Sequence, residues 1–341
     1  MALPKIVSLF SGAGGLDLGF HEAGFPVVFA IDSSAAAIKT HTRNFPRTAS
    51  IAADLVELGP RGVLNHLGNL LADGEPIGVI GGPPCQGFSR ANTGSAANDP
   101  RNSLPLLYLQ IVEALQAKYD VQFVLFENVL GIRDTKHALV FKGILSKFEA
   151  IGLTARVNEC SALDYGVAQS RNRVIISGFH RAEVAASFRP VQVAGKRLTV
   201  RSVIGSLPPP VFYSRVLTSA DIPHHENHWT MRPISKRFSD AGGARGDRSF
   251  RRLEWDKPSP TVAYGHREIH VHPDGRRRLS IYEAMLIQGF PPEFVLEGTL
   301  SAQVDQVSNA VPPPLARALA AAIDRALSAE SLCLEQKALS A

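Results

Sequence analysis

Short apolar runs alternate with helix-spaced apolar positions over residues 1–180 of the chain. This alternation is typical of a sheet covered by helices, because each strand is followed by an element that returns the chain to the same edge. The pattern predicts an α/β fold with helices on both faces of the sheet. Its strands are expected over 5–10, 26–31, 77–80, 122–126, 154–160 and 173–179, and its helices over 15–23, 35–44, 103–118 and 137–150.

The pattern changes in the second half of the chain. From 186 to 275, proline, glycine, histidine and arginine are frequent and no period persists, which indicates a smaller, loop-rich domain. A helical run follows over 281–288, and an alanine-rich run over 315–327 predicts a long helix that starts at a triple proline and packs on the first domain. We expect a first domain over 1–185, a smaller domain with a hinge over 186–295, a returning segment over 296–330 and a tail over 331–341.

Composition is that of an ordinary globular protein. The chain has 341 residues, 45% hydrophobic and 20% charged, which suffices for one large and one smaller core. Its three cysteines are widely spaced without a CxxC pair, which argues against a disulfide framework or a zinc site and favours a reducing compartment. No apolar stretch has transmembrane length and no secretion signal is visible, so we expect a soluble intracellular protein.

Positive charge is concentrated in one segment. Residues 232–278 contain 12 Lys and Arg against 6 Asp and Glu, a net charge of +6, whereas the whole chain carries +5. The remainder of the chain is therefore close to neutral. A basic segment of this kind is typical of a surface that binds a polyanion, with an ordinary solvated surface as the alternative.

A glycine-rich loop follows the first predicted strand. It reads Phe10-Ser11-Gly12-Ala13-Gly14-Gly15-Leu16. Such glycines allow a sharp turn and a close approach of a ligand to the backbone. A dinucleotide-binding GxGxxG motif would need a glycine at position 17, where the chain has Asp17. A carboxylate at this helix start disfavours a pyrophosphate and favours a cationic or zwitterionic ligand.

Two further acids follow the next strands. Asp32 ends the second predicted strand, where an acid holds ribose hydroxyls in nucleotide-binding folds; the alternative is a helix-capping role. Asp54 lies beyond a third short run and is placed to accept from an adenine amino group. Together with Asp17, these acids favour S-adenosylmethionine, a sulfonium cation, over NAD. An NAD-dependent oxidoreductase is the disfavoured alternative.

The tripeptide Pro84-Cys85-Gln86 leaves the strand predicted over 77–80. Open parallel sheets place their chemistry at the carboxyl ends of such strands. A proline pair fixes the backbone before Cys85, and glycines flank the motif on both sides. A lone cysteine is usually a small buried hydrophobe, but this setting favours a nucleophile.

These motifs, with others further along, resemble the bacterial-type DNA (cytosine-5)-methyltransferase family. The resemblance follows the family's order over nearly the whole chain and leaves only 180–250 without a pattern. The chain departs from the family at Asp32, where glutamate is common, and at Ala168, where proline is frequent. The segments that carry the resemblance are FSGAGGLDLGF, the segment IDSSAAAIKTHTRNFP, GGPPCQGFS, Phe126-Glu127-Asn128-Val129, DYGVAQSRNR (164–173), RRLEWDKPSPTV, LIQGFPPEF and QVSNAVPP.

The resemblance implies covalent catalysis with Cys85 as the nucleophile. Carbon 5 of cytosine accepts a methyl group only after a thiolate has added to carbon 6, and the base must be flipped out of the duplex to reach the thiol. Glu127 would contact nitrogen 3 and the exocyclic amine, and burial would keep it protonated for donation. Arg173 would neutralise charge near oxygen 2, and Arg171 would orient the pocket or the thiol.

The resemblance also implies which residues bind the cofactor and the DNA. Gln169 and Asn128 would hold the catalytic groups in place, and residues 86–102 would form a loop that closes over the DNA. S-adenosylmethionine, released as S-adenosylhomocysteine, would be held by Phe10, Gly12, Gly14, Gly15, Leu16, Asp32, Asp54, Leu55, Pro84, Asn309 and Ala310. Double-stranded DNA would be contacted by Gln86, Ser89, Arg90, Gln169, Arg232, Arg245, Arg248, Arg251 and Arg252, largely from 186–295 as a target-recognition domain.

Several broader expectations follow from the same resemblance. The protein would act as a monomer on DNA, without a membrane, in the nucleoid-containing cytoplasm of a bacterium, alongside a cognate restriction or defence system. An RNA cytosine-5 methyltransferase with the same mechanism and a non-catalytic DNA-binding homologue remain alternatives; the basic segment and the intact Cys85 argue against them. We expect no metal, because the histidines between 224 and 272 lack cysteines and regular ligand spacing.

Overall fold

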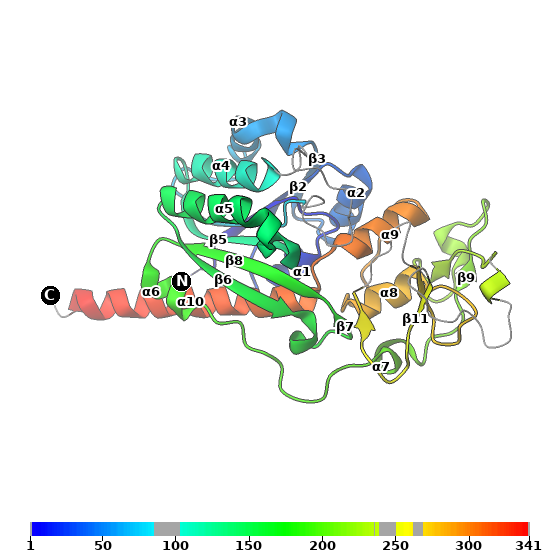
Figure 1. Cartoon of the computed structure of the whole chain (residues 1–341). Coiled ribbons are helices and arrows are strands. Elements are labelled where there is room, and N and C mark those ends of the chain that lie inside the picture. The colour runs from blue at the N-terminus through cyan, green and yellow to red at the C-terminus, as the bar shows by residue number, and fades with distance from the viewer. Residues whose placement is uncertain (1, 85–102, 235, 239–249, 262–268, 340–341) are drawn as a thin grey trace.

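The computed structural model describes residues 2–84, 103–234, 236–238, 250–261 and 269–339. Its centre is a seven-stranded sheet in the order β3-β2-β1-β4-β5-β8-β6 (Figure 1). The strands are β1 (Lys5–Leu9), β2 (Val27–Asp32), β3 (Ala49–Ala52), β4 (Pro76–Gly81), β5 (Asp120–Val129), β6 (Thr154–Ser161) and β8 (Asn172–Phe179).

The first five strands are parallel, and the last pair changes direction. β1 pairs in parallel with both β2 and β4, β2 with β3, and β4 with β5. β8 lies antiparallel between β5 and β6. Because parallel strands all end at the same edge, the loops after β1, β2, β4 and β5 meet there, next to the start of β8.

Helices cover both faces of this sheet (Figure 1). Alternate residues of a strand face opposite sides, so Val7 and Leu9 enter one core while Ile6 enters the other. The first core is closed by α3 (Leu55–Leu67), α4 (Leu104–Gln116) and α5 (Ala138–Ala150). The second is closed by α1 (Gly15–Glu22), α6 (Ala182–Ser187) and α10 (Pro313–Leu339).

The long carboxyl-terminal helix lies directly against the first helix. A Cβ atom at Gly19 would come within 2.4 Å of the Ala316 Cβ and of the Arg317 backbone nitrogen. This glycine therefore permits α1 and α10 to approach closely. The contact returns the end of the chain to the sheet, as the alanine-rich run predicted.

A third core lies beside the sheet. It is built on α7 (Val200–Ile204), α8 (Ile281–Ile287) and α9 (Leu300–Asn309), and it includes Leu18 and Phe45 of the first part of the chain. We call residues 200–287 the small unit. Two of its strand ladders are β9 (Val211–Phe212) with β10 (Trp229–Thr230) and β11 (Phe250–Arg252) with β13 (Ile269–Val271). A third joins β12 (Ser259–Pro260) of the small unit to β7 (Gln169–Ser170), which lies outside it.

The predicted α/β class is confirmed, and several element bounds differ. α2 (Ala35–Asn44) has the predicted bounds, whereas α10 extends twelve residues beyond the predicted 315–327, to Leu339. α3 was not predicted, because Gly59 (φ 60°) and Pro60 kink it and interrupt its apolar period. Among the described residues, no helix is long and apolar enough to cross a membrane.

Candidate active site at the carboxyl edge of the sheet

An ion pair marks the edge of the sheet where β5 meets β8. Glu127 and Arg173 lie on neighbouring antiparallel strands as diagonal neighbours, since Val129 is the register partner of Arg173. Arg173 Nε lies 2.6 Å from Glu127 Oε1, and both side chains are about nine-tenths buried. Arg173 and Glu127 therefore bring a guanidinium and a carboxylate together at the carboxyl edge of the sheet.

A second arginine lies beside this pair. Arg171 is 1% exposed and donates from one terminal nitrogen to the carbonyl oxygen of Ser308 at 2.7 Å. Burial, followed by the charge of Arg173, lowers the pKa of Arg171, and Glu127 opposes this effect. Its Nε has no hydrogen-bond partner among the described residues. Two guanidinium groups against one carboxylate leave an excess of positive charge, suited to stabilising negative charge on a substrate.

The loop that leads to Cys85 is fixed against the same carboxylate. The Asn128 side-chain amide donates to the carbonyl oxygen of Pro83 at 3.3 Å. A Cβ atom at Gly82 would lie 2.8 Å from Glu127 Oε2, so only glycine fits there without displacing the carboxylate. Pro84 is exposed at the end of the described segment. The predicted site residues Cys85, Gln86, Ser89 and Arg90 lie outside the described residues.

Gln169, predicted to contact DNA and to hold the catalytic groups, is fully buried. Its side-chain amide donates to Gln288 Oε1 at 3.1 Å. Gln288 in turn donates to the carbonyl oxygens of Val307 and Ala310, at 2.8 and 2.6 Å. The structure therefore places Gln169 inside the molecule, between the β7–β8 edge, α8 and the end of α9. Its contact with DNA stays a prediction.

The glycine loop after β1 combines an open position with packed ones. Phe10 has a φ of 55°, which is rare for a residue with a Cβ atom and marks a strained turn. A Cβ atom at Gly12 would meet nothing within 4 Å, so open space faces the backbone there. Gly14 (φ 91°) packs on the rings of Phe45 and His41, and Gly15 packs on the Val311 carbonyl oxygen. Leu16 is buried in the second core.

Asp32 closes this loop from the end of β2. Its Oδ2 accepts from the Gly12 backbone N–H at 2.9 Å and its Oδ1 from the Ser34 N–H at 2.8 Å. Burial raises the pKa of Asp32, and the two N–H donors oppose this effect. Ser34, not Asp32, caps α2 through its hydroxyl oxygen. Asp32 thus joins the second strand to the open position of the loop.

The remaining predicted cofactor residues lie around this edge in different settings. Asp54 caps α3, accepting from the Val56 N–H at 2.8 Å, and Leu55 is buried in the first core. Asn309 is exposed at the end of α9, and Ala310 follows it. Asp17 is fully buried and lies 3.3 Å from His41 Nε2.

The predicted DNA-contacting arginines of the small unit are exposed where the structure describes them. Arg232 lies over the Phe212 ring at 5.6 Å, and Arg251 and Arg252 are on β11. Arg245 and Arg248 lie outside the described residues. In the described ranges no three His, Cys, Asp or Glu side chains form a metal-binding group.

The parallel sheet and the glycine loop after β1 fit the class of S-adenosylmethionine-dependent methyltransferases. Residues 4–325 match the C-5 cytosine-specific DNA methylase family, and the chain belongs to this family. It is a DNA cytosine-5 methyltransferase, which confirms the resemblance in its motifs. It is 33% identical to the Type II methyltransferase M1.HphI of Haemophilus parahaemolyticus over 93% of this chain and 86% of that protein. It is also 33% identical to M.MthTI of Methanothermobacter thermautotrophicus, over 94% and 97% respectively.

Solved structures show the same fold. A candidate DNA modification methyltransferase encoded within an E. coli prophage superposes with a TM-score of 0.75 at 24% identity, over 95% of this chain and 99% of that one. The Dnmt2 methyltransferase of S. pombe superposes with a TM-score of 0.63 at 17% identity, over 95% and 99%.

Sequence reasoning missed three residues of this edge. Gln288 lies in the LIQGFPPEF segment, which was noted without a role for any of its residues. Gly82 lies in the GGPPCQGFS segment, where the proline pair and the cysteine drew attention instead. His41 is a buried helix residue whose partner, Asp17, comes from another helix. Each owes its position to a contact between segments far apart in sequence.

Proposed function

We propose that the protein transfers a methyl group to carbon 5 of a flipped-out cytosine in a specific duplex sequence, through a bond between Cys85 Sγ and carbon 6. The observation that supports this most strongly is the hydrogen bond from Asn128 to the Pro83 carbonyl oxygen, beside a Gly82 whose missing Cβ leaves room for Glu127. It places Glu127 and the paired Arg173 next to the loop that leads to Cys85. When bound, S-adenosylmethionine supplies an electrophilic methyl group.

In this proposal the two arginines and Glu127 stabilise different charges that develop on the cytosine ring. Addition of the Cys85 thiolate to carbon 6 places negative charge on nitrogen 3 and oxygen 2 of the base. The excess positive charge of Arg171 and Arg173 stabilises that charge. Glu127, released from Arg173 by the incoming base and carrying one proton, accepts a hydrogen bond from the exocyclic amine at one oxygen. Its other oxygen donates that proton to nitrogen 3. After carbon 5 has gained the methyl group, solvent water takes the carbon 5 proton while the bond between Cys85 Sγ and carbon 6 breaks and the thiolate leaves.

The glycine loop fits S-adenosylmethionine in this proposal. Gly12 leaves open space next to its backbone. Among the described residues, each Asp32 carboxylate oxygen accepts from one donor, so lone pairs remain for ribose hydroxyls. Asp54 would accept from the adenine amine, and Asn309 and Ala310 would close the far side. The Asp17 carboxylate lies at the first turn of α1, where it favours a cation over a pyrophosphate.

The small unit would supply the DNA contacts, within a target-recognition domain over 186–295. Its exposed Arg232 and Arg251 suit phosphates or guanine edges. Because the relatives are named Type II methyltransferases, we propose a restriction-modification setting in which methylation protects one short sequence.

Bisulfite sequencing tests this proposal directly. The protein and its Cys85→Ala variant are expressed in a bacterial host without cytosine methylation, and genomic DNA is sequenced. We expect cytosines that resist bisulfite conversion at one short motif with the wild type, and no such cytosines with the variant. Cytosines that resist conversion but share no sequence motif would contradict sequence-specific methylation. Absence of resistance with well-expressed protein, combined with methyl transfer to tRNA in vitro, would assign the RNA alternative instead.

A further inference from the structure

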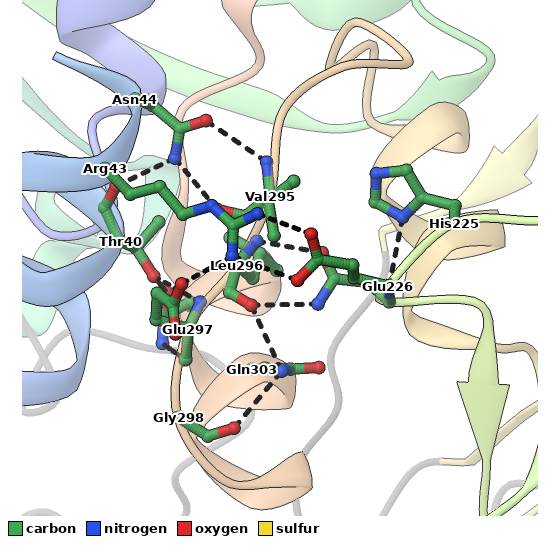
Figure 2. Close-up of polar contacts among 12 residues, drawn as sticks. Thr40, Arg43, Asn44, His225, Glu226, Val295, Leu296, Glu297, Gly298 and Gln303 are labelled. Carbon is green, nitrogen blue, oxygen red and sulfur yellow. Dashed lines mark hydrogen bonds and ion pairs between the residues drawn. The ribbon is translucent and has the colours of Figure 1, made fainter. Parts of the chain in front are cut away.

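Residues 295–298 belong to the segment between α8 and α9, and they lie between α2 on one side and the small unit on the other (Figure 2). We call these four residues the strap. The side chains that hold it come from Thr40, Arg43 and Asn44, which share one face of α2 because they are three or four positions apart. On the opposite side the strap is held by the loop around Glu226 and Asn227.

Two asparagine side chains bind consecutive backbone units of the strap. Asn44 donates to the Val295 carbonyl oxygen at 2.8 Å and accepts from the Val295 N–H at 3.1 Å. Asn227 makes the same pair of bonds with Leu296, at 2.9 and 2.8 Å. Each amide thus completes both backbone groups of one residue, as a neighbouring strand would. The strap is fixed simultaneously to α2 and to the small unit.

Arg43 joins all three parts through charge. Its guanidinium donates to both oxygens of Glu226 on the small unit, at 2.5 and 3.0 Å, and to Glu297 on the strap at 2.6 Å (Figure 2). The fork geometry of arginine allows this double engagement, which a lysine ammonium cannot reproduce. With two carboxylates around one guanidinium, the cluster has a net negative charge and does not favour a DNA phosphate.

Thr40 extends the connection to α9. Its hydroxyl accepts from the Glu297 N–H at 2.7 Å and donates to Gln306 Oε1 at 2.6 Å, and Gln306 donates to the Glu297 carbonyl oxygen at 2.9 Å. α9 ends at Asn309, next to the backbone that holds Arg171 and Gln288. The face of α2 is therefore connected both to the small unit and to the active-site edge.

We propose that Arg43 is a positioning residue that sets the orientation of the small unit relative to the catalytic edge and thereby sharpens the choice of DNA sequence. The proposal rests on the proposed function for its substrate. Exposed ion pairs contribute little to stability on their own, and Arg43, Glu226 and Glu297 are each more than a third exposed at the side chain. The contribution of Arg43 is therefore expected in geometry, where small displacements affect rate strongly.

The test compares Arg43→Ala, Arg43→Lys and Glu226→Gln with the wild type. The control is Arg201→Ala, which removes a bidentate arginine–aspartate pair with Asp256 inside the small unit. The main measurement is the ratio of methylation rates at the recognised sequence and at sequences with one altered base pair. S-adenosylmethionine affinity, duplex affinity and thermal unfolding are measured for each protein.

We expect Arg43→Ala to lower this ratio roughly tenfold and Glu226→Gln to lower it in the same direction, with cofactor affinity within about twofold of wild type. Arg43→Lys should recover only part of the ratio, and Arg201→Ala should leave it unchanged. An unchanged ratio in Arg43→Ala would overturn the proposal. So would tighter duplex binding by Glu226→Gln, because that result would show Arg43 released to contact a phosphate.

A second measurement separates this inference from the proposed function. Hydrogen exchange at the amides of 295–297 and of Asn227 requires no activity. We expect faster exchange on both sides of the strap in Arg43→Ala and unchanged exchange in Arg201→Ala. If the wild type methylates no DNA but this change occurs, the proposed function fails and the positioning role of Arg43 stands. If the wild type is active and neither exchange nor the ratio changes, the positioning role fails alone.

Discussion

Asn128 donates to the carbonyl oxygen of Pro83, two residues before Cys85, while its neighbour Glu127 lies 2.6 Å from Arg173. The end of β5 therefore contacts both the loop after β4 and the start of β8. A change at this end of β5 would therefore affect both Glu127 and the loop that leads to Cys85.

Arg173→Ala should reduce single-turnover methyl transfer by about 10²- to 10³-fold, because it removes a buried positive charge from the place where negative charge develops. Affinity for S-adenosylmethionine should stay near wild type. The rate is measured with a radiolabelled methyl donor and a duplex that contains the recognised sequence. Arg197→Ala, which breaks an exposed pair with Asp164, is the control and should be fully active. Equal rates for the two variants would contradict the assignment.

Gly82→Ala should impair the reaction with little effect on folding. The new Cβ atom would lie 2.8 Å from Glu127 Oε2, so the carboxylate or the loop must shift. We expect turnover to fall by roughly tenfold or more, since displacements of this size at reacting groups are costly. Gly143→Ala in α5 is the matched control, because nothing lies within 4 Å of its Cβ position and helix propensity predicts a slight stabilisation. Full activity in Gly82→Ala would show that the contact is irrelevant to catalysis.

Asp32→Asn should weaken S-adenosylmethionine binding, by roughly tenfold or more, because a neutral amide accepts less strongly and turns an N–H group toward one of the two backbone donors. Isothermal titration calorimetry measures the affinity. Asp221→Asn is a suitable control, since that carboxylate also accepts from a backbone N–H, that of Thr218, but lies in the small unit. Unchanged affinity in Asp32→Asn would exclude a part for this residue in the cofactor site.

Stability should fall as the pH decreases from about 6.5 toward 4. Burial, with the nearby charge of Arg251, lowers the pKa of His270 from 6.5 to about 4. Between these pH values the unfolded chain binds a proton that the folded chain does not, so the free energy of unfolding decreases as the pH falls. The contribution of His270 to stability is complete above pH 6.5. Burial also lowers the pKa values of His225 and His228, which adds to the same slope.

Urea unfolding at several pH values between 4 and 7 measures this dependence. Replacing His270 with glutamine should reduce the slope by up to about 1.4 kcal/mol per pH unit, whatever its effect on overall stability. A variant whose slope equals that of the wild type would show that His270 is not the titrating group.

The sequence predicted most of the sheet because buried strands and amphipathic helices have their own periods. α2 has its predicted bounds, and β5 and β8 contain the predicted runs. It failed at α3, where Gly59 and Pro60 interrupt the helical pattern, and at α9, whose apolar positions are few because glutamines fill its buried face. In both cases tertiary packing stabilises a helix that the local sequence pattern does not indicate.

The sequence by itself determined the family: the glycine loop, Asp32 and the cysteine motif indicated a cofactor and a nucleophile, and the resemblance implied parts for Glu127 and the two arginines. Only the tertiary structure decided how they are held. It paired Glu127 with Arg173, buried Gln169 against Gln288, and placed Arg43 between Glu226 and Glu297. These partners lie up to 254 residues apart. A local pattern carries no information about such contacts, because their geometry depends on how whole elements pack.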